Sequence, residues 1–230
     1  MRILGIDTSG IVAAAAIYDS DSDVLLAQQL VYTKRTHSQV ILPLVERLFN
    51  DTGLSIDDID KIVVAAGPGS YTGLRIGIAS VKAMSFAKNI ACCGVSTLKS
   101  LSFQAHFAGE QIVCAVMKAR KGLVYAGIYH FDKDNACTEL MKDALMPEET
   151  LLTKLSEYKG VILTGDGATE FLAAYKPADV LLAPAEVRLQ NGVGLCKCAV
   201  NCENGDPCQL EARYLQLAKA EKDRLDNNKN

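Results

Sequence analysis

The segment from residue 61 to residue 88 limits the fold more than any other part of the chain. It reads KIVVAA, then the loop GPGSYTG at 67–73, then GLRIGIASVKAMSFAK. The first run predicts a buried strand, and the last predicts a helix at 73–88. The Gly-Pro-Gly that opens the loop sets a rigid turn between them. A chain of 230 residues built on such strand–turn–helix units has room for one large α/β domain or two small ones.

The glycine loop itself is open to two interpretations. It is not a P-loop, because GxxxxGK[ST] is absent, and its GxGxxxG spacing differs from the Rossmann fingerprint. It is either a structural loop that lets the helix pack tightly on the sheet, or a loop that contacts a ligand or a partner. The residues concerned are Gly67, Pro68, Gly69, Ser70 and Gly73.

The helix expected at 73–88 has too little polar surface for a helix that faces water. Only three of its residues are charged, and Ala79, Ala83 and Ala87 form a ridge of small residues. A surface helix should show a broad polar face. The sheet can cover one side, so a partner subunit is the natural cover for the other. The alternative is a helix buried wholly within one lobe.

The rest of the pattern repeats strands followed by helices. Strands are expected at 2–6, 11–18, 23–31, 61–66, 90–95, 111–117, 123–131 and 160–164, and helices between Thr36 and Gly53 and at 73–88, 97–107, 168–176 and 187–202. Thr36 and Gln39 have the spacing of a capping box. We therefore expect two related α/β lobes with mixed sheets flanked by helices. The first spans 1–108, the second 109–216, and a polar tail follows at 217–230.

Two polar features in the first lobe are candidates for chemistry. Asp7-Thr8-Ser9 follows the first strand, where actin-like ATPases hold phosphate and metal; the alternative is a turn stabilised by its own side chains. His37 opens the first helix, but a di-histidine metal site would need a second His at position 41, which is Ile41. We interpret His37 as a polar contact residue and expect no metal site and no catalytic residue.

Charge and cysteine usage bear on partners and location. The chain has 24 basic and 27 acidic residues, so it has no basic excess to hold a phosphate backbone by itself. The N-terminal segment does not resemble a signal peptide, and no apolar run is long enough to span a membrane. We expect a cytoplasmic protein whose eight cysteines are reduced thiols.

Five blocks of sequence together resemble one family. They are THSQVILPLV, AGPGSYTGLRIGIASVKAM, GVSTLKSLS, ARKGLVYAGIY and LEARYLQ, in this order. The chain resembles the TsaB (YeaZ) proteins over roughly residues 1–217. The resemblance implies the two-lobed actin-like ATPase (ASKHA) fold. It also implies a non-catalytic subunit that pairs with a TsaD-type paralogue, together with a TsaE-type ATPase, to make threonylcarbamoyladenosine in tRNA.

The resemblance also implies where pairing occurs. The family pairs through its first two helices, with itself when alone or with the TsaD-type subunit, which carries the metal-binding histidines. Here these helices are His37 to Phe49 and Thr72 to Lys88. The candidate interface residues are His37, Val40, Ile41, Leu44, Arg75, Ile76, Ala79, Ala83 and Ala87. The chain would reach tRNA only through the complex.

Nucleotide chemistry is not expected of this chain alone. The position of a second phosphate loop, residues 117–122, has neither an Asp nor a glycine run, and Lys118 stands where the family commonly has Asp. The vestigial cofactor residues are Asp7, Thr8, Ser9, Gly165, Asp166 and Gly167. The resemblance leaves room for a nucleotide shared at the partner interface. The alternatives are a degenerate actin-like ATPase, a sugar-kinase-like enzyme or a glycoprotease-like peptidase.

Overall fold

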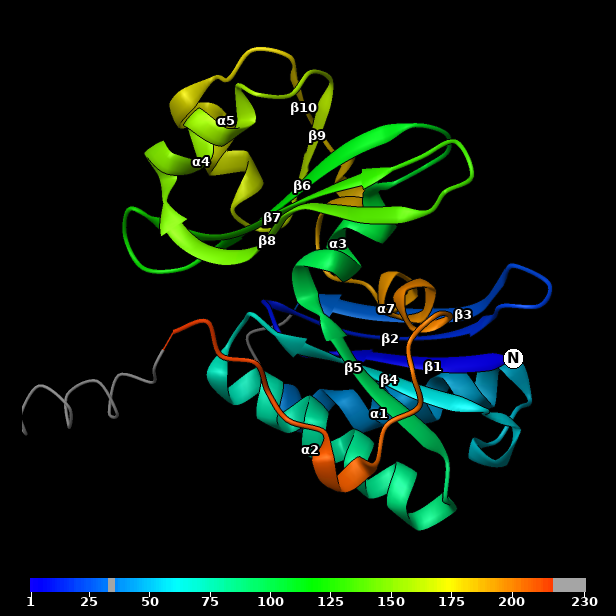
Figure 1. Ribbon diagram of the computed structural model, residues 1–230. Helices are drawn as coiled ribbons and strands as arrows, with labels where there is room; N and C mark the ends of the chain where they lie inside the picture. The colour runs from blue at the N-terminus through cyan, green and yellow to red at the C-terminus, as the bar shows by residue number, and fades with distance from the viewer. Residues whose placement is uncertain (33–35, 217–230) are drawn as a thin grey trace, which may run out of the picture.

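The computed structural model describes residues 1–32 and 36–216 and contains two five-stranded mixed sheets, one in each lobe (Figure 1). The strands are β1 (Arg2–Asp7), β2 (Val12–Asp19), β3 (Val24–Tyr32), β4 (Lys61–Gly67), β5 (Ala91–Ser96), β6 (Gln111–Lys118), β7 (Leu123–Phe131), β8 (Cys137–Pro147), β9 (Val161–Thr164) and β10 (Val180–Leu182). The helices are α1 (His37–Thr52), α2 (Tyr71–Lys88), α3 (Thr97–Ala105), α4 (Glu148–Leu155), α5 (Ala168–Tyr175), α6 (Ala185–Arg188) and α7 (Gly192–Ala199), with single 3₁₀ turns at Ile56–Asp58 and Pro207–Gln209.

Both lobes have the same topology. The strand order is β3-β2-β1-β4-β5 in the first sheet and β8-β7-β6-β9-β10 in the second. In each sheet the first three strands form an antiparallel meander, and the last two join in parallel. The expectation of two related lobes with mixed sheets is therefore confirmed. The chain passes from one sheet to the other between Ala105 and Gln111.

Four apolar clusters fill the spaces between layers. The first sheet packs on α1 and α2 through one face and on α7 through the other. The second sheet packs on α3 through one face and on α4 and α5 through the other. Figure 1 shows α3 and α7 between the two sheets. Because β1 and β2 are covered on both faces, they read as continuous apolar runs rather than as alternating patterns.

Helix α7 lies unusually close to the first sheet because small residues face each other there. A Cβ added to Gly5 would lie 2.5 Å from the carbonyl oxygen of Gly192 and 2.8 Å from the sulfur of Cys196. A Cβ on Gly192 would meet the backbone nitrogen of Ala16 at 2.5 Å. The chain therefore returns to the first lobe after residue 191. The division at residue 108 assigned 109–216 to the second lobe, and it allowed for a return of the last helix to the first.

Three local expectations were wrong. The stretch between residues 132 and 159, to which we assigned no strand or helix, contains β8 and α4. The helix expected at 187–202 is two helices, α6 and α7, because the chain crosses between lobes at Gln190 and Asn191. Thr36 caps α1 without a side-chain hydrogen bond, so the capping box with Gln39 does not form.

The chain after α7 forms what we call the C-terminal strap, residues 203–216, which runs along the edge strand β5 and over α2 (Figure 1). The backbone N–H of Gly205 donates to the carbonyl of Cys92 at 2.8 Å, and that of Arg213 donates to Ala66 at 2.7 Å. Tyr214 stacks on Tyr71 at the start of α2, with 4.8 Å between ring centroids. The strap thus covers one edge of the first sheet.

Candidate functional site and the exposed helix face

The turn after β1 is buried, and it hydrogen-bonds to itself and to the glycine loop. Asp7, Thr8 and Ser9 are each at most 1% exposed. The Asp7 Oδ1 atom accepts hydrogen bonds from the Ser9 backbone at 2.8 Å and from the Ser9 hydroxyl at 2.6 Å. The Thr8 hydroxyl donates to the carbonyl of Gly73 at 2.7 Å. The turn therefore fastens α2 to the end of β1.

The glycine loop reaches the same turn from the other side. The Ser70 backbone N–H donates to the carbonyl of Ser9 at 2.7 Å, and the Ser70 hydroxyl caps α2 by accepting from Gly73 at 3.2 Å. A Cβ on Gly69 would lie 2.5 Å from the Ser9 carbonyl oxygen, and one on Gly73 would overlap that of Thr8. Close packing of backbone on backbone accounts for these two glycines.

The first residues of the loop lie beside the strap and the second lobe. Gly67 has a φ of 121°, and a Cβ there would overlap the carbonyl oxygen of Arg213. Pro68 lines a groove of about 210 Å³ together with Ser96, Asp143 and Arg213. The Ser96 hydroxyl donates to the Asp143 carboxylate, which joins the two lobes at this point.

The second-lobe glycine element packs on the end of β6. Gly165 has a φ of 98°, and a Cβ there would overlap the carbonyl oxygen of Val116. The Gly167 N–H donates to the same carbonyl at 3.1 Å. Asp166 Oδ1 accepts from the Lys118 N–H at 3.0 Å, and burial raises the pKa of this carboxyl. Asp166 thus accepts a hydrogen bond from the backbone of residues 117–122, the segment at the position of a second phosphate loop.

Gln190 lies between the two lobes, a role that no sequence motif indicated. It is 1% exposed, and its amide occupies the space that a Cβ on Gly10 would need. Its Nε2 atom lies 3.8 Å from the sulfur of Met117 at the end of β6. The side chain therefore fills space between the first-lobe turn and the second-lobe sheet.

His37 faces inward toward the turn. Its Nε2 atom lies 2.8 Å from the carbonyl oxygen of Gly10. Among the described residues, neither the buried His37 Nδ1 atom nor the buried Asp7 Oδ2 atom has a hydrogen-bond partner. Burial raises the pKa of Asp7 to about 6, although the hydrogen bonds from Ser9 and the His37 charge act in the opposite direction. Within residues 1–32 and 36–216, no three His, Cys, Asp or Glu side chains are grouped to hold a metal ion.

The raised pKa of Asp7 predicts a pH-dependent gain in stability for Asp7→Asn. The folded-state pKa of about 6 lies above the ordinary value of 3.8, so wild-type stability is full below about pH 4 and falls as pH rises through 6. At pH 7.5 we expect the variant to be more stable by about 3 kcal/mol, and at pH 4 the difference should vanish. Urea unfolding at both pH values measures this. The exposed Asp134→Asn is the control; an equal pH response in both variants would contradict the prediction.

The exposed face of α1 and α2 agrees only in part with the candidate interface. Arg75, Ala79, Ala83 and Ala87 are exposed, and Val40, Ile76 and His37 are half-buried. Ile41 and Leu44 are 1% and 8% exposed, and Ile41 belongs to the apolar cluster between α1 and the first sheet. We expected both at a surface interface, but both are buried. Two large apolar residues that we had not selected are exposed instead: Leu42 at 51% and Phe86 at 78%. We call Leu42, Ala79, Ala83, Phe86 and Ala87 the exposed helix face.

Two further findings bear on the surface. The described part of the chain contains no helix with the length and apolarity to cross a bilayer. Arg75 lies over the Tyr71 ring, 4.0 Å from its centroid, and its Nε atom donates to the Tyr214 hydroxyl at 3.1 Å. The strap residue Tyr214 therefore holds Arg75 and Tyr71 in place at the start of α2, next to the exposed helix face.

Comparison with solved structures defines the class of fold. YeaZ from Pseudomonas aeruginosa superposes with a TM-score of 0.78 at 24% identity, covering 93% of this chain and 99% of that one. A chain of the PilM–PilN type IV pilus biogenesis complex gives 0.51 at 6% identity, covering 88% and 99%. Together with the repeated topology, these matches make the protein a two-lobed member of the actin-like ATPase fold class.

Sequence relatives define the family. The family model described as TsaD, tRNA N6-adenosine threonylcarbamoyltransferase, matches residues 31–206. The Escherichia coli tRNA threonylcarbamoyladenosine biosynthesis protein TsaB is 30% identical over 191 residues, 82% of this chain and 81% of that protein. Its Bacillus subtilis counterpart is 39% identical over 132 residues, 57% of this chain and 56% of that protein's length. The chain belongs to the TsaB (YeaZ) family.

Proposed function

We propose that this chain is the partner subunit of a tRNA-modifying assembly in which a TsaD-type paralogue makes threonylcarbamoyladenosine. Membership of the TsaB family supports a role in this pathway, because the relatives from E. coli and B. subtilis are named tRNA threonylcarbamoyladenosine biosynthesis proteins. The exposed helix face supports the role. The single observation that carries the proposal is Phe86, an aromatic side chain that is 78% exposed beside a ridge of alanines.

The geometry of the two helices suits pairing with a chain of the same fold. Helices α1 and α2 contact each other on one side of the first sheet, as Figure 1 shows, so both present their outer surfaces on that side of the molecule. A TsaD-type paralogue would present an equivalent pair, and four helices would then pack around a pseudo-two-fold axis. The same face would support a homodimer when the chain is alone. Small residues at Ala79 and Ala83 allow backbones to approach closely.

In this proposal the TsaD-type partner, and not this chain, carries out the transfer of the threonylcarbamoyl group. In this chain Asp7 accepts hydrogen bonds from Ser9, Thr8 holds the glycine loop through the Gly73 carbonyl, and Asp166 accepts from the Lys118 backbone. Gln190 fills space between the lobes. With a net charge of −3, the chain is also poorly suited to hold tRNA directly. We therefore expect tRNA contact through the complex, and a TsaE-type ATPase as the third component.

Reconstitution tests the proposal. The purified chain is combined with TsaD-type and TsaE-type subunits, ATP, a threonylcarbamoyl donor and unmodified tRNA. Mass spectrometry of nuclease-digested tRNA then measures threonylcarbamoyladenosine. We expect product only when this chain is present, and negligible ATP turnover by this chain alone. Equal product without the chain would refute the proposal. ATP turnover by the pure chain that Asp7→Asn abolishes would instead favour the alternative, a degenerate actin-like ATPase.

A further inference from the structure

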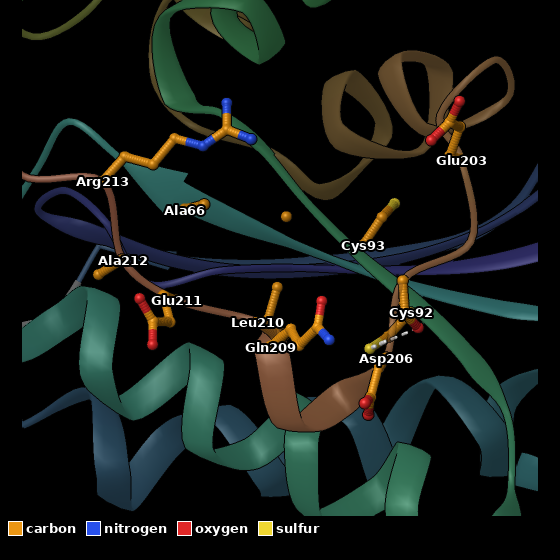
Figure 2. Close-up of a pocket in the computed structure, with 12 residues that line it drawn as sticks. Ala66, Cys92, Cys93, Glu203, Asp206, Gln209, Leu210, Glu211, Ala212 and Arg213 are labelled. Carbon is orange, nitrogen blue, oxygen red and sulfur yellow. Dashed lines mark hydrogen bonds between the residues drawn. The ribbon is translucent and has the colours of Figure 1, made fainter.

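A groove lies between α2 and the C-terminal strap, at the border of the exposed helix face. Its volume is about 330 Å³, and its main lining residues are Arg75, Ile78, Ala79 and Lys82 on α2 with Glu211 and Tyr214 on the strap. We call it the strap groove. Figure 2 shows Glu211 on the part of the strap that runs beside α2. Since Ala79 also belongs to the exposed helix face, a partner that covers this face also lies against the groove.

Two tyrosines hold the Arg75 side chain at one end of the strap groove. The guanidinium lies 4.0 Å from the centroid of the Tyr71 ring, and its Nε atom donates to the Tyr214 hydroxyl at 3.1 Å. The two tyrosine rings also stack on each other, with 4.8 Å between their centroids. The hydrogen bond uses one of the five N–H donors of the guanidinium, and the exposed side chain can offer the other four to a ligand.

The strap backbone holds Lys82 at the other end of the groove. Its half-buried side chain extends to the strap, where Nζ donates to the carbonyl of Cys208 at 3.2 Å. An ammonium group has three N–H donors, so two remain for a ligand. Lys82 follows Arg75 by seven positions, or two helical turns, so both residues lie on one face of α2, about 10 Å apart along its axis. The strap thus sets the positions of both cations.

These two cations are not neutralised within the described part of the chain. Glu211 lines the same groove, but neither Arg75 nor Lys82 forms an ion pair with it or with any other described carboxylate. The groove therefore carries two positive charges against one negative charge. Ile78 and Ala79 lie between the two cations along the helix and add apolar lining. Such a surface favours a carboxylate, which a guanidinium binds through two parallel hydrogen bonds.

We propose that the strap groove receives an acidic helix of the TsaD-type partner, whose carboxylates, two turns apart, bind Arg75 and Lys82. The inference rests on the proposed function and adds the charge that the partner must carry. A helix packed alongside α2 presents residues i and i+7 on one face, at the spacing of the two cations. Because the strap holds both side chains before binding, they lose little conformational freedom on association. Arginine and tyrosine side chains supported in this way often dominate the affinity of an interface.

Charge reversal tests the groove in the full-length chain. Arg75→Glu and Lys82→Glu replace an attraction with a repulsion, so each should weaken binding of the TsaD-type partner by about tenfold at about 50 mM salt. At about 500 mM salt the loss should shrink to about threefold, because salt screens the charges. Isothermal titration calorimetry measures both values. The control Lys133→Glu makes the same change at an exposed turn of the second lobe and should leave the dissociation constant within about twofold of the wild type.

Comparison with Ala83→Glu, a change on the exposed helix face, separates this inference from the proposed function. If Ala83→Glu weakens pairing but both charge reversals leave it unchanged, the face pairs without the groove, and the inference is wrong. If all three variants bind like the wild type, both proposals fail. Equal loss at low and high salt would reveal a packing defect in place of an acidic ligand and would also overturn the inference. So would equal weakening of self-pairing, because the groove would then receive a second copy of the chain.

Neutral variants decide the matter if a charge reversal disturbs folding. Arg75→Gln and Lys82→Gln remove the charge and keep a good helix former, so circular dichroism should show both variants folded. Each should weaken partner binding by about threefold at about 50 mM salt and reduce the salt dependence of the dissociation constant. Wild-type affinity in both would overturn the inference. Tyr214→Phe keeps the ring that stacks on Tyr71 but removes the acceptor for the Arg75 Nε atom. It should weaken binding less than Arg75→Gln does; a larger loss would contradict Arg75 as the group that binds the partner.

Discussion

Changing Ala83 to Glu is expected to abolish pairing while the protein stays folded. Ala83 is exposed at the centre of the exposed helix face, and glutamate is a good helix former, so α2 should tolerate it. In a complex through this face the carboxylate would be buried without a partner. An uncompensated buried charge costs about 3 to 5 kcal/mol. Association should therefore weaken by about 100-fold to 4,000-fold.

Sedimentation and size-exclusion experiments measure this effect, for the chain alone and with a TsaD-type partner. The matched control is Ala173→Glu, which makes the same change at an exposed alanine of α5 in the second lobe. The control should pair like the wild type, and circular dichroism should show both variants folded. If Ala83→Glu pairs with unchanged affinity, contact occurs through another surface. If Ala83→Glu unfolds while Ala173→Glu does not, α2 contributes to the core through this face, and the proposed role loses its physical support.

The expected effect of Ala83→Glu depends on the exposed helix face, and the sequence predicted only part of that face. The scarcity of charge along 73–88 predicted a helix covered on two sides, and the alanine ridge is indeed on the outer side. The sequence could not tell which apolar residues of α1 point outward. Leu42 and Leu44 are chemically identical and two positions apart, yet one is 51% and the other 8% exposed. That difference depends on the rotation of α1 against β2 and β3, which is a tertiary property.

In the candidate site, features set by local sequence were predicted, and contacts between distant residues were not. The buried strands, the glycine loop and the hairpin of β6 and β7 follow local patterns, and all were predicted close to their observed bounds. The contact of Gln190 with Gly10 joins residues 180 positions apart, so no local pattern could have indicated it. Strand β8 was missed because only one of its eleven residues is buried, which leaves no clear apolar alternation.

The second large effect is expected at the glycine loop, where Gly73→Ala should destabilise the fold. Gly73 lies in the first turn of α2, and a Cβ there would overlap the carbonyl oxygen of Thr8. Thr8 cannot retreat easily, because it is 1% exposed and its hydroxyl donates to the Gly73 carbonyl. Overpacking of this kind costs about 3 kcal/mol. For a chain of this size the melting temperature should fall by about 10 °C.

The direction of this effect separates packing from helix propensity. Alanine is the better helix former by about 1 kcal/mol, so propensity alone predicts that Gly73→Ala stabilises the protein. The neighbouring Thr72→Ala also raises propensity, but Thr72 is exposed, and its change should stay within about 0.5 kcal/mol. Thermal and urea unfolding followed by circular dichroism compare the two variants. If Gly73→Ala is as stable as Thr72→Ala, the loop is not pinned on the Asp7–Ser9 turn. The loop backbone would then be free to contact a ligand, which is the second interpretation that its sequence allows.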